Sequence, residues 1–91
     1  TVNGYGDAVR HCYWCALNQV SAGLNSPLAE EFGNAHENRP TNTEKEKRMD
    51  LHNNAVGYHL GNQAIINGWS EEELLNQVID AANNGQLKIG L

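Results

Sequence analysis

The stretch that decides the fold is Thr43–Ile66, with the sequence TEKEKRMDLHNNAVGYHLGNQAII. Its first four residues, Thr43 to Glu46, have the Thr-x-x-Glu form of a capping box, which marks the start of a helix. Asn67-Gly68 follows it and is typical of a chain break. The stretch therefore predicts one long helix, from about Glu44 to Ile66, the longest of the chain.

This long helix carries both close-packing and polar residues. Gly57 and Gly61 are one turn apart and can let a second backbone approach closely, and we expect that backbone to be the first helix. His52 and Asn53 are expected to point inward, where a polar group without a hydrogen bond costs about 1–3 kcal/mol. His59 lies outside the helix face that carries His52 and Asn53. The face comprises Met49, His52, Asn53, Val56, Leu60 and Ala64.

Three further helices are predicted around the long one. The first runs from about Asp7 to Val20 or Ser21. The second opens at Ser26-Pro27, with serine as N-cap and proline at the first helical position, and Arg39-Pro40 stops it. The fourth follows a second capping box at Ser70–Glu73 and ends near Asn83.

Each of these helices has an apolar stripe that we expect to be buried. The stripes are Val9, Tyr13, Ala16, Leu17 and Val20 in the first helix, Leu28, Ala29, Phe32 and Ala35 in the second, with His36 beside them, and Leu74, Leu75, Val78, Ile79 and Ala82 in the fourth. Residues 87–91 are expected to form a short strand or a docked tail. We predict an all-α fold in which residues 1–91 form a single compact domain of about four helices, cut from a longer protein.

The charge and composition of the chain disfavour some classes of binding partner. The net charge of −5 disfavours a broad nucleic-acid-binding surface, and no stretch approaches the length of a transmembrane helix. The two cysteines, Cys12 and Cys15, are three apart in a predicted helix, where a disulfide would be strained. We interpret them as small buried thiols, with a metal or redox role as the alternative.

The first helix also carries a polar cluster. Asp7, Arg10, His11 and Trp14 are spaced i, i+3, i+4 and i+7, which places them on one face. His11 can transfer protons or bind a metal, Asp7 can orient its imidazole, and Arg10 can hold an anion with its planar fork. The alternative is a solvated surface pair beside a satisfied histidine.

Two more polar clusters follow, His36-Glu37 and Asp50–Asn54. His36 lies in the last turn of its helix, where the dipole alone favours a histidine. If the three clusters converge, they form an acid–base site, with or without a divalent metal ion. The candidate catalytic residues are Asp7, Arg10, His11, His36, Glu37, Asp50, His52 and Asn53, and the candidate metal ligands are His11, His36, Asp50 and His52.

Three sequence blocks resemble a bacterial domain found at the C-terminal ends of Rhs/YD-repeat and other polymorphic-toxin proteins. The blocks are Asp7-Ala8-Val9-Arg10-His11 with Trp14, Ala35-His36-Glu37, and Met49-Asp50-Leu51-His52-Asn53-Asn54 with Gly57. The resemblance covers roughly Tyr5–Gly61, and it makes Asn54 a signature residue as well.

This resemblance implies a toxin delivered into a target bacterial cell and neutralised by a cognate immunity protein. The activity that we expect is hydrolysis of a phosphoester in a lipid, a cell-wall precursor or a nucleotide. Two alternatives remain. One is a phospholipase A2-like enzyme, although Cys12 stands where that class has a calcium-binding aspartate and its disulfides are absent. The other is a non-catalytic module in which the polar residues form a buried network.

Overall fold

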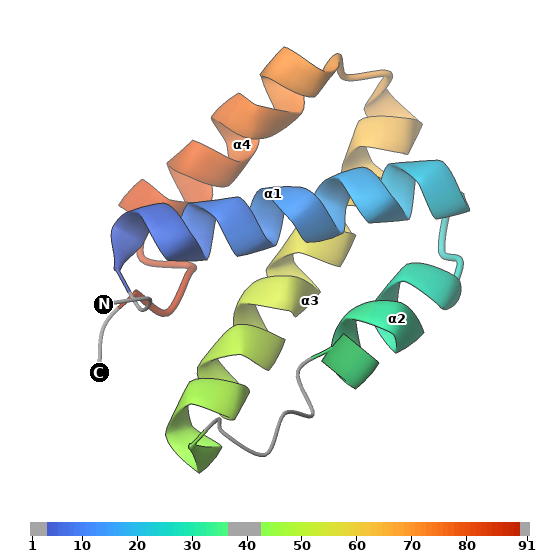
Figure 1. The fold of residues 1–91 in the computed structure, drawn as a ribbon. Coiled ribbons are helices and arrows are strands. Elements are labelled where there is room, and N and C mark those ends of the chain that lie inside the picture. The colour runs from blue at the N-terminus through green and yellow to red at the C-terminus, as the bar shows by residue number, and fades with distance from the viewer. Residues whose placement is uncertain (1–3, 37–42, 90–91) are drawn as a thin grey trace.

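Four helices make up the part of the chain that the structure describes, as the sequence predicts. The computed structural model describes residues 4–36 and 43–89, apart from the side chains of residues 34–36. The helices are α1 (Tyr5–Ala22), α2 (Leu28–His36), α3 (Glu44–Asn67) and α4 (Glu71–Asn83). α1 lies across α3, with α4 on one side of the crossing and α2 on the other (Figure 1). The predicted all-α fold is confirmed, and α3 is the longest helix.

The predicted capping box of α3 is formed. The Thr43 hydroxyl accepts the backbone N–H of Glu46 at 3.1 Å, and the Glu46 carboxylate accepts the backbone N–H of Thr43 at 3.0 Å. At the other end, Gly68 adopts a left-handed conformation with φ of 68° and caps the helix. Glycine reaches this conformation without steric cost, so the chain turns sharply into α4 here.

α1 and α3 meet through their smallest residues. A Cβ atom added to Gly61 would lie 2.6 Å from the carbonyl oxygen of Ala16, and one added to Gly57 would collide with the carbonyl oxygen of Cys12. The expected close approach at the two glycines is therefore confirmed. The α1 stripe that we predicted is shifted: Val20 is exposed, and the buried residues are the small Ala8, Cys12, Cys15 and Ala16 together with Gln19, whose side chain lies against Gly61.

The expected burial of Leu28 and Phe32 in α2 is wrong, since their exposed fractions are 65% and 63%. α2 packs instead through Ala29, which is buried with Cys15 and Tyr58, and through Gly33. A Cβ atom at Gly33 would collide with the hydroxyl group of Tyr58. The face of α2 with the least bulk is therefore the one that fits against α3.

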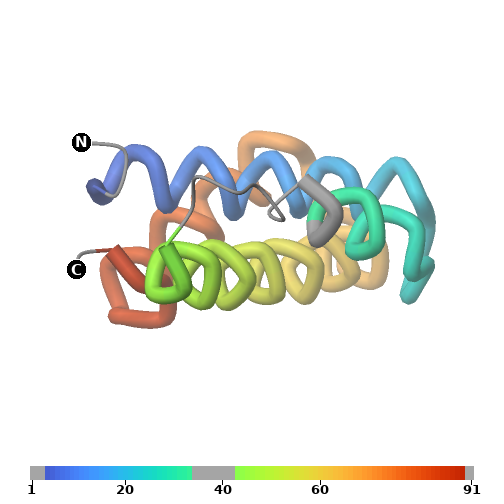
Figure 2. The backbone as a smooth tube through the Cα atoms, turned by 60° about the horizontal axis from the view of Figure 1, so that its bottom comes forward, coloured from blue at the N-terminus to red at the C-terminus, as the bar shows by residue number. Residues whose placement is uncertain are grey.

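The C-terminal segment docks as a tail against α3, and no strand occurs in the described residues. Leu87 is buried in one cluster with Ala8, Cys12, Val78 and Ala82. Figure 2 shows the segment beside the first turns of α3. None of the described helices combines the length and the apolar character that crossing a membrane requires.

Candidate functional site

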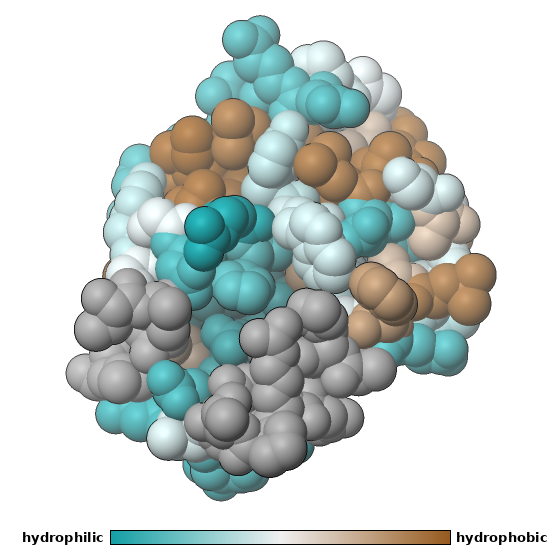
Figure 3. Space-filling view, in the orientation of Figure 1, coloured by the Kyte–Doolittle hydropathy of each residue, from teal (hydrophilic) through white to brown (hydrophobic). Residues whose placement is uncertain are grey.

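Asp7 holds together the polar cluster of α1. One carboxylate oxygen accepts a hydrogen bond from a guanidinium nitrogen of Arg10, and the other lies 3.5 Å from Nε2 of His11. The side chain of Asp7 is 14% exposed, whereas those of His11 and Arg10 are 33% and 76% exposed. One nearly covered carboxylate therefore positions two side chains that solvent reaches. Hydrophilic surface lies over the N-terminal half of α1 in this orientation, with apolar surface over α2 (Figure 3).

Helix geometry places His11 and Asn54 on the same side of the α1–α3 crossing. Cys15 of α1 and Tyr58 of α3 belong to one buried cluster, and the two helices run in the same general direction where they cross. His11 is one turn before Cys15, and Asn54 is one turn before Tyr58, so both precede the same contact. Asp7 and Asp50 come a further turn before it, and Asp50 is half-buried. The first and third sequence blocks thus lie on the parts of α1 and α3 that precede this crossing.

Asn54 is a buried polar residue of the third sequence block that is not among the candidate catalytic residues. It is only 1% exposed, and its amide nitrogen lies 3.8 Å from where a Cβ atom of Gly33 would stand. Its carbonyl oxygen is buried and has no hydrogen-bond partner among the described residues. A buried polar atom of this kind is costly and is often kept for a reason beyond packing. The only signal in the sequence was its place in the third block.

The second sequence block lies largely outside the described structure. His36 is the last residue of α2, but its side chain is not among those described, and Glu37 lies outside the described residues. The convergence of all three blocks therefore stays a prediction.

His52 and Asn53 bind the C-terminal tail. The Asn53 amide donates to the Lys88 carbonyl at 2.9 Å, and its own carbonyl accepts the Lys88 backbone N–H at 2.8 Å. Nε2 of His52 lies 2.8 Å from the Gln86 carbonyl, which makes it the donor. Asn53 is buried as expected, but the expected burial of His52 is wrong, because it sits at the edge of α3 and is exposed. His59 is exposed, as expected.

The described side chains do not assemble a metal site by themselves. In the described part of the chain, no three His, Cys, Asp or Glu side chains lie close enough to hold a metal ion. His11, Asp50 and His52 therefore do not form a three-ligand set with one another. His52 has its Nε2 engaged by the Gln86 carbonyl, so only its Nδ1 could bind a metal ion.

Cys12 and Cys15 are free thiols inside the α1–α3 interface, both completely buried. Burial raises the pKa of Cys12 from 9.0 to about 12, and the neighbouring Cys15 adds to the effect. A thiol that stays protonated is a poor nucleophile and a poor metal ligand. The interpretation as small packing residues is therefore supported over a redox or metal role.

This raised pKa predicts a loss of stability at alkaline pH. The unfolded thiol ionises near pH 9, but the folded one does so near pH 12. The stability linked to the Cys12 proton is thus fully present below pH 9 and is lost as pH rises toward 12. We expect the midpoint of urea unfolding to fall over this range, and to fall less steeply in Cys12→Ala. Equal slopes for the two proteins would contradict the burial argument.

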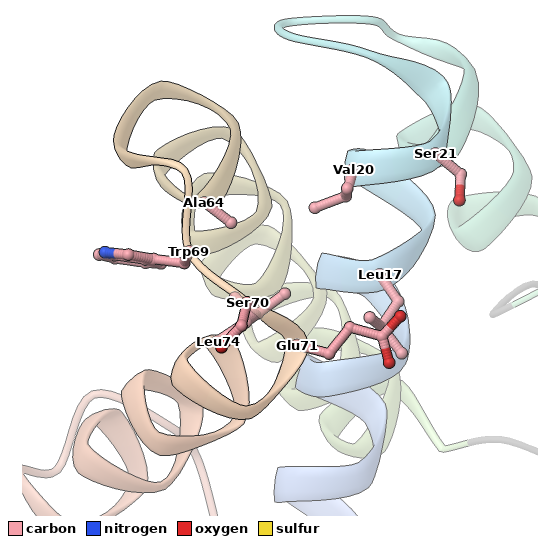
Figure 4. Close-up of a pocket in the computed structure, with 8 residues that line it drawn as sticks. All are labelled: Leu17, Val20, Ser21, Ala64, Trp69, Ser70, Glu71 and Leu74. Carbon is pink, nitrogen blue, oxygen red and sulfur yellow. The ribbon is translucent and has the colours of Figure 1, made fainter.

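A separate pocket of about 190 Å³ lies at the far end of α1, away from the predicted site residues. Figure 4 shows it between α1 and the junction of α3 with α4, with the Glu71 side chain reaching toward Leu17. Its walls are mainly apolar and it has no histidine. The lining residues are Leu17, Val20, Ser21, Ala64, Trp69, Ser70, Glu71 and Leu74. This pocket lacks the acid–base groups that the α1 cluster provides.

Comparison with known proteins places the chain in a family without giving it an activity. No solved structure matches the chain. Residues 1–86 match a family model described as a domain of unknown function, DUF6973. The match includes all three sequence blocks and ends just before Leu87. The chain therefore belongs to the DUF6973 family.

Proposed function

We propose that this domain is a hydrolytic toxin that acts on a phosphoester through His11, Asp7 and Arg10. The observation that carries the proposal is the position of Asp7, which contacts Arg10 and His11 at once. An acid–base group and an anion-binding group held by one carboxylate suit the transfer of a proton beside a negatively charged substrate. The resemblance of the three sequence blocks to polymorphic-toxin domains supports the biological setting.

His11 has the proton-transfer role. Asp7 lies 3.5 Å from Nε2, so it orients the ring. Nδ1 has no hydrogen-bond partner among the described residues, and a third of the side chain is exposed to solvent. A substrate can therefore reach the ring while Asp7 holds its other side.

Arg10 has the anion-binding role. Its guanidinium uses one nitrogen on Asp7 and is otherwise well exposed, so further N–H donors remain for a phosphoryl oxygen. With Asp7 ionised, the three side chains sum to zero charge when His11 is neutral and to +1 when it is protonated. The positive charge of Arg10 attracts an anionic substrate to the cluster that contains His11.

The proposal also includes polar residues of the third sequence block. Asn54 has a buried carbonyl oxygen without a described partner, and Asp50 lies one turn before it on α3. His36 and Glu37 complete this set in the proposal, as ligands of a divalent metal ion or as further acid–base groups. A cognate immunity protein is the proposed partner, and delivery into a target bacterial cell is the proposed route.

A specific observation favours a second candidate function, a non-catalytic module. Asn53 has both ends of its amide paired with the backbone of Lys88, which is how a structural network satisfies buried groups. In this case the polar residues of the third block would fix the fold, and the α1 cluster would be a surface ion pair.

Induced expression in bacteria distinguishes the two functions. We expect the domain to stop growth, either in the cytoplasm or with an export signal, and His11→Ala to abolish this effect while the domain stays folded. A loss of at least about 100-fold fits the removal of a general acid–base group. His59→Ala is the matched control, because His59 is exposed on α3 and outside the cluster.

Growth, lysis, membrane leakage and nucleic-acid content then identify the class of target. A His11→Ala domain that is folded and fully toxic would refute the proton-transfer role. A domain with no effect in either compartment, including when purified and tested on phosphoester substrates, would favour the non-catalytic module.

A further inference from the structure

Three positively charged side chains surround a second pocket, at the start of α3. Lys45 and Arg48 come from the first two turns of α3, and Lys88 comes from the C-terminal tail. Met49 supplies the remaining wall, and the pocket holds about 200 Å³. The chain has only 6 Lys and Arg against 11 Asp and Glu, so half of all its Lys and Arg residues line this one pocket.

No ion pair neutralises these three cations within the described residues. The ion pairs that the structure gives for the described residues join Asp7 to Arg10 and to His11, and neither involves Lys45, Arg48 or Lys88. Like charges gathered without a counterion repel one another, and an anionic ligand relieves that repulsion.

The C-terminal tail completes this pocket with Lys88, and hydrogen bonds hold the backbone of Lys88 in place. Asn53 grips both the N–H and the carbonyl of Lys88, at 2.8 and 2.9 Å, which holds this residue beside α3. The preceding residue, Leu87, is buried in the core. Lys88 is thus held by its two hydrogen bonds to Asn53 and by the burial of its neighbour Leu87. Asn53 therefore positions a pocket residue that lies 35 positions away in the sequence.

The lining favours a ligand with an apolar body as well as a charge. Met49 is buried, and the long side chains of lysine and arginine present aliphatic stems to the pocket while their charged ends reach solvent. A volume of 200 Å³ is that of about six or seven water molecules, which suits a short chain and not a drug-sized molecule.

We infer that this pocket binds a small anionic amphiphile, with a phosphate or carboxylate head among Lys45, Arg48 and Lys88 and a short apolar chain against Met49. The site is separate from the α1 cluster and does not depend on the proposed hydrolytic function. The same chemistry is available from a soluble alkyl phosphate or from an anionic lipid in a membrane.

Met49 is the only methionine of the chain, so its methyl group is a unique NMR probe inside the pocket. We expect hexyl phosphate to shift the resonance of the ¹³C-labelled methyl group in a saturable way. Hexanol has only the apolar chain, and inorganic phosphate has only the anionic group. We expect each of them to bind at least about tenfold more weakly than hexyl phosphate. Hexanol binding as tightly as hexyl phosphate would overturn the role of the cations, and phosphate binding as tightly would overturn the role of the apolar wall.

The matched variants are Lys45→Gln with Lys88→Gln, and Lys47→Gln. Glutamine keeps most of the aliphatic stem and removes the charge, so we expect the double variant to weaken hexyl phosphate binding about tenfold or more. Lys47 is the neighbouring cation that does not line the pocket, and its replacement should leave the affinity unchanged. All the exchanged side chains are on exposed residues or at the edge of solvent, and a thermal melt checks that the fold persists.

Vesicles distinguish the two sources of the ligand. Sedimentation with phosphatidylglycerol vesicles but not with phosphatidylcholine vesicles, lost in the double variant, would identify the lipid as the source. Binding of hexyl phosphate without sedimentation would identify a soluble ligand. No response of Met49 to hexyl phosphate and no sedimentation with either vesicle would refute the proposal, and so would equal responses in the double variant and the native chain.

Discussion

Gly61→Ala and Gly57→Ala are expected to destabilise the domain more than any other single methyl group added to the chain. At Gly61 the new methyl group would lie 2.6 Å from the carbonyl oxygen of Ala16, and at Gly57 it would meet the carbonyl oxygen of Cys12. Both obstacles are backbone atoms of α1, so a side-chain rotation cannot relieve the collision. The two helices must separate instead, and that loosens the whole crossing.

We expect each change to lower the free energy of unfolding by about 2–3 kcal/mol or more, at the upper end of what overpacking usually costs. A domain of this size has a total stability of roughly 5–15 kcal/mol, so the double variant should be close to unfolded. Urea unfolding followed by circular dichroism measures this directly.

Gly6→Ala is the control for these two variants. Gly6 is also in a helix, but a Cβ atom there has no neighbour within 4 Å. Alanine restricts the unfolded chain more than glycine does, so this variant should be as stable as the native protein or gain up to about 1 kcal/mol. Equal stability of Gly61→Ala and Gly6→Ala would show that α1 and α3 do not cross where the structure places them.

Asn53→Ala is expected to release the C-terminal tail. The change removes two hydrogen bonds to the backbone of Lys88 and leaves a gap at a site that is 2% exposed. Because the partner groups lose their bonds and Leu87 loses its support, we expect a cost of roughly 2–4 kcal/mol. Faster hydrogen exchange of the tail amides and a lower melting temperature would report it.

His52→Ala is the matched variant for this test. His52 is exposed and makes a single hydrogen bond to Gln86, so its loss should cost only about 0.5–1.5 kcal/mol. Toxicity measured on the same two variants decides the role of His52. If growth inhibition collapses in a His52→Ala domain that melts normally, His52 belongs to the functional site. If Asn53→Ala melts at the same temperature as the native chain, the hydrogen bonds between Asn53 and Lys88 do not hold the tail against α3.

The sequence alone determined the number and order of the described helices and the ends of α3. Their signals are local: the Thr43–Glu46 capping box, Ser70 at the start of α4, and the left-handed Gly68 each act within one turn of chain. The glycine pair of α3 also predicted the α1–α3 crossing, because a helix that lacks Cβ atoms on one face needs a partner that fills the space. The link between Asp7, Arg10 and His11 followed from helical spacing in the same way.

Tertiary structure decided which face of each helix is buried. Apolar periodicity favoured Val20 and Phe32, but both are exposed, because Gly57 and Gly61 bring α3 against Cys12, Ala16 and Gln19 of α1, and Gly33 brings α2 against Tyr58. From helical spacing we predicted that His52 and Asn53 share one buried face of α3. Successive residues of a helix differ by a rotation of 100°, so Asn53 is buried and His52 lies at the exposed edge. The cationic pocket could not be predicted at all, because Lys88 reaches Lys45 only through the folded chain, and no local pattern encodes a contact between residues so far apart.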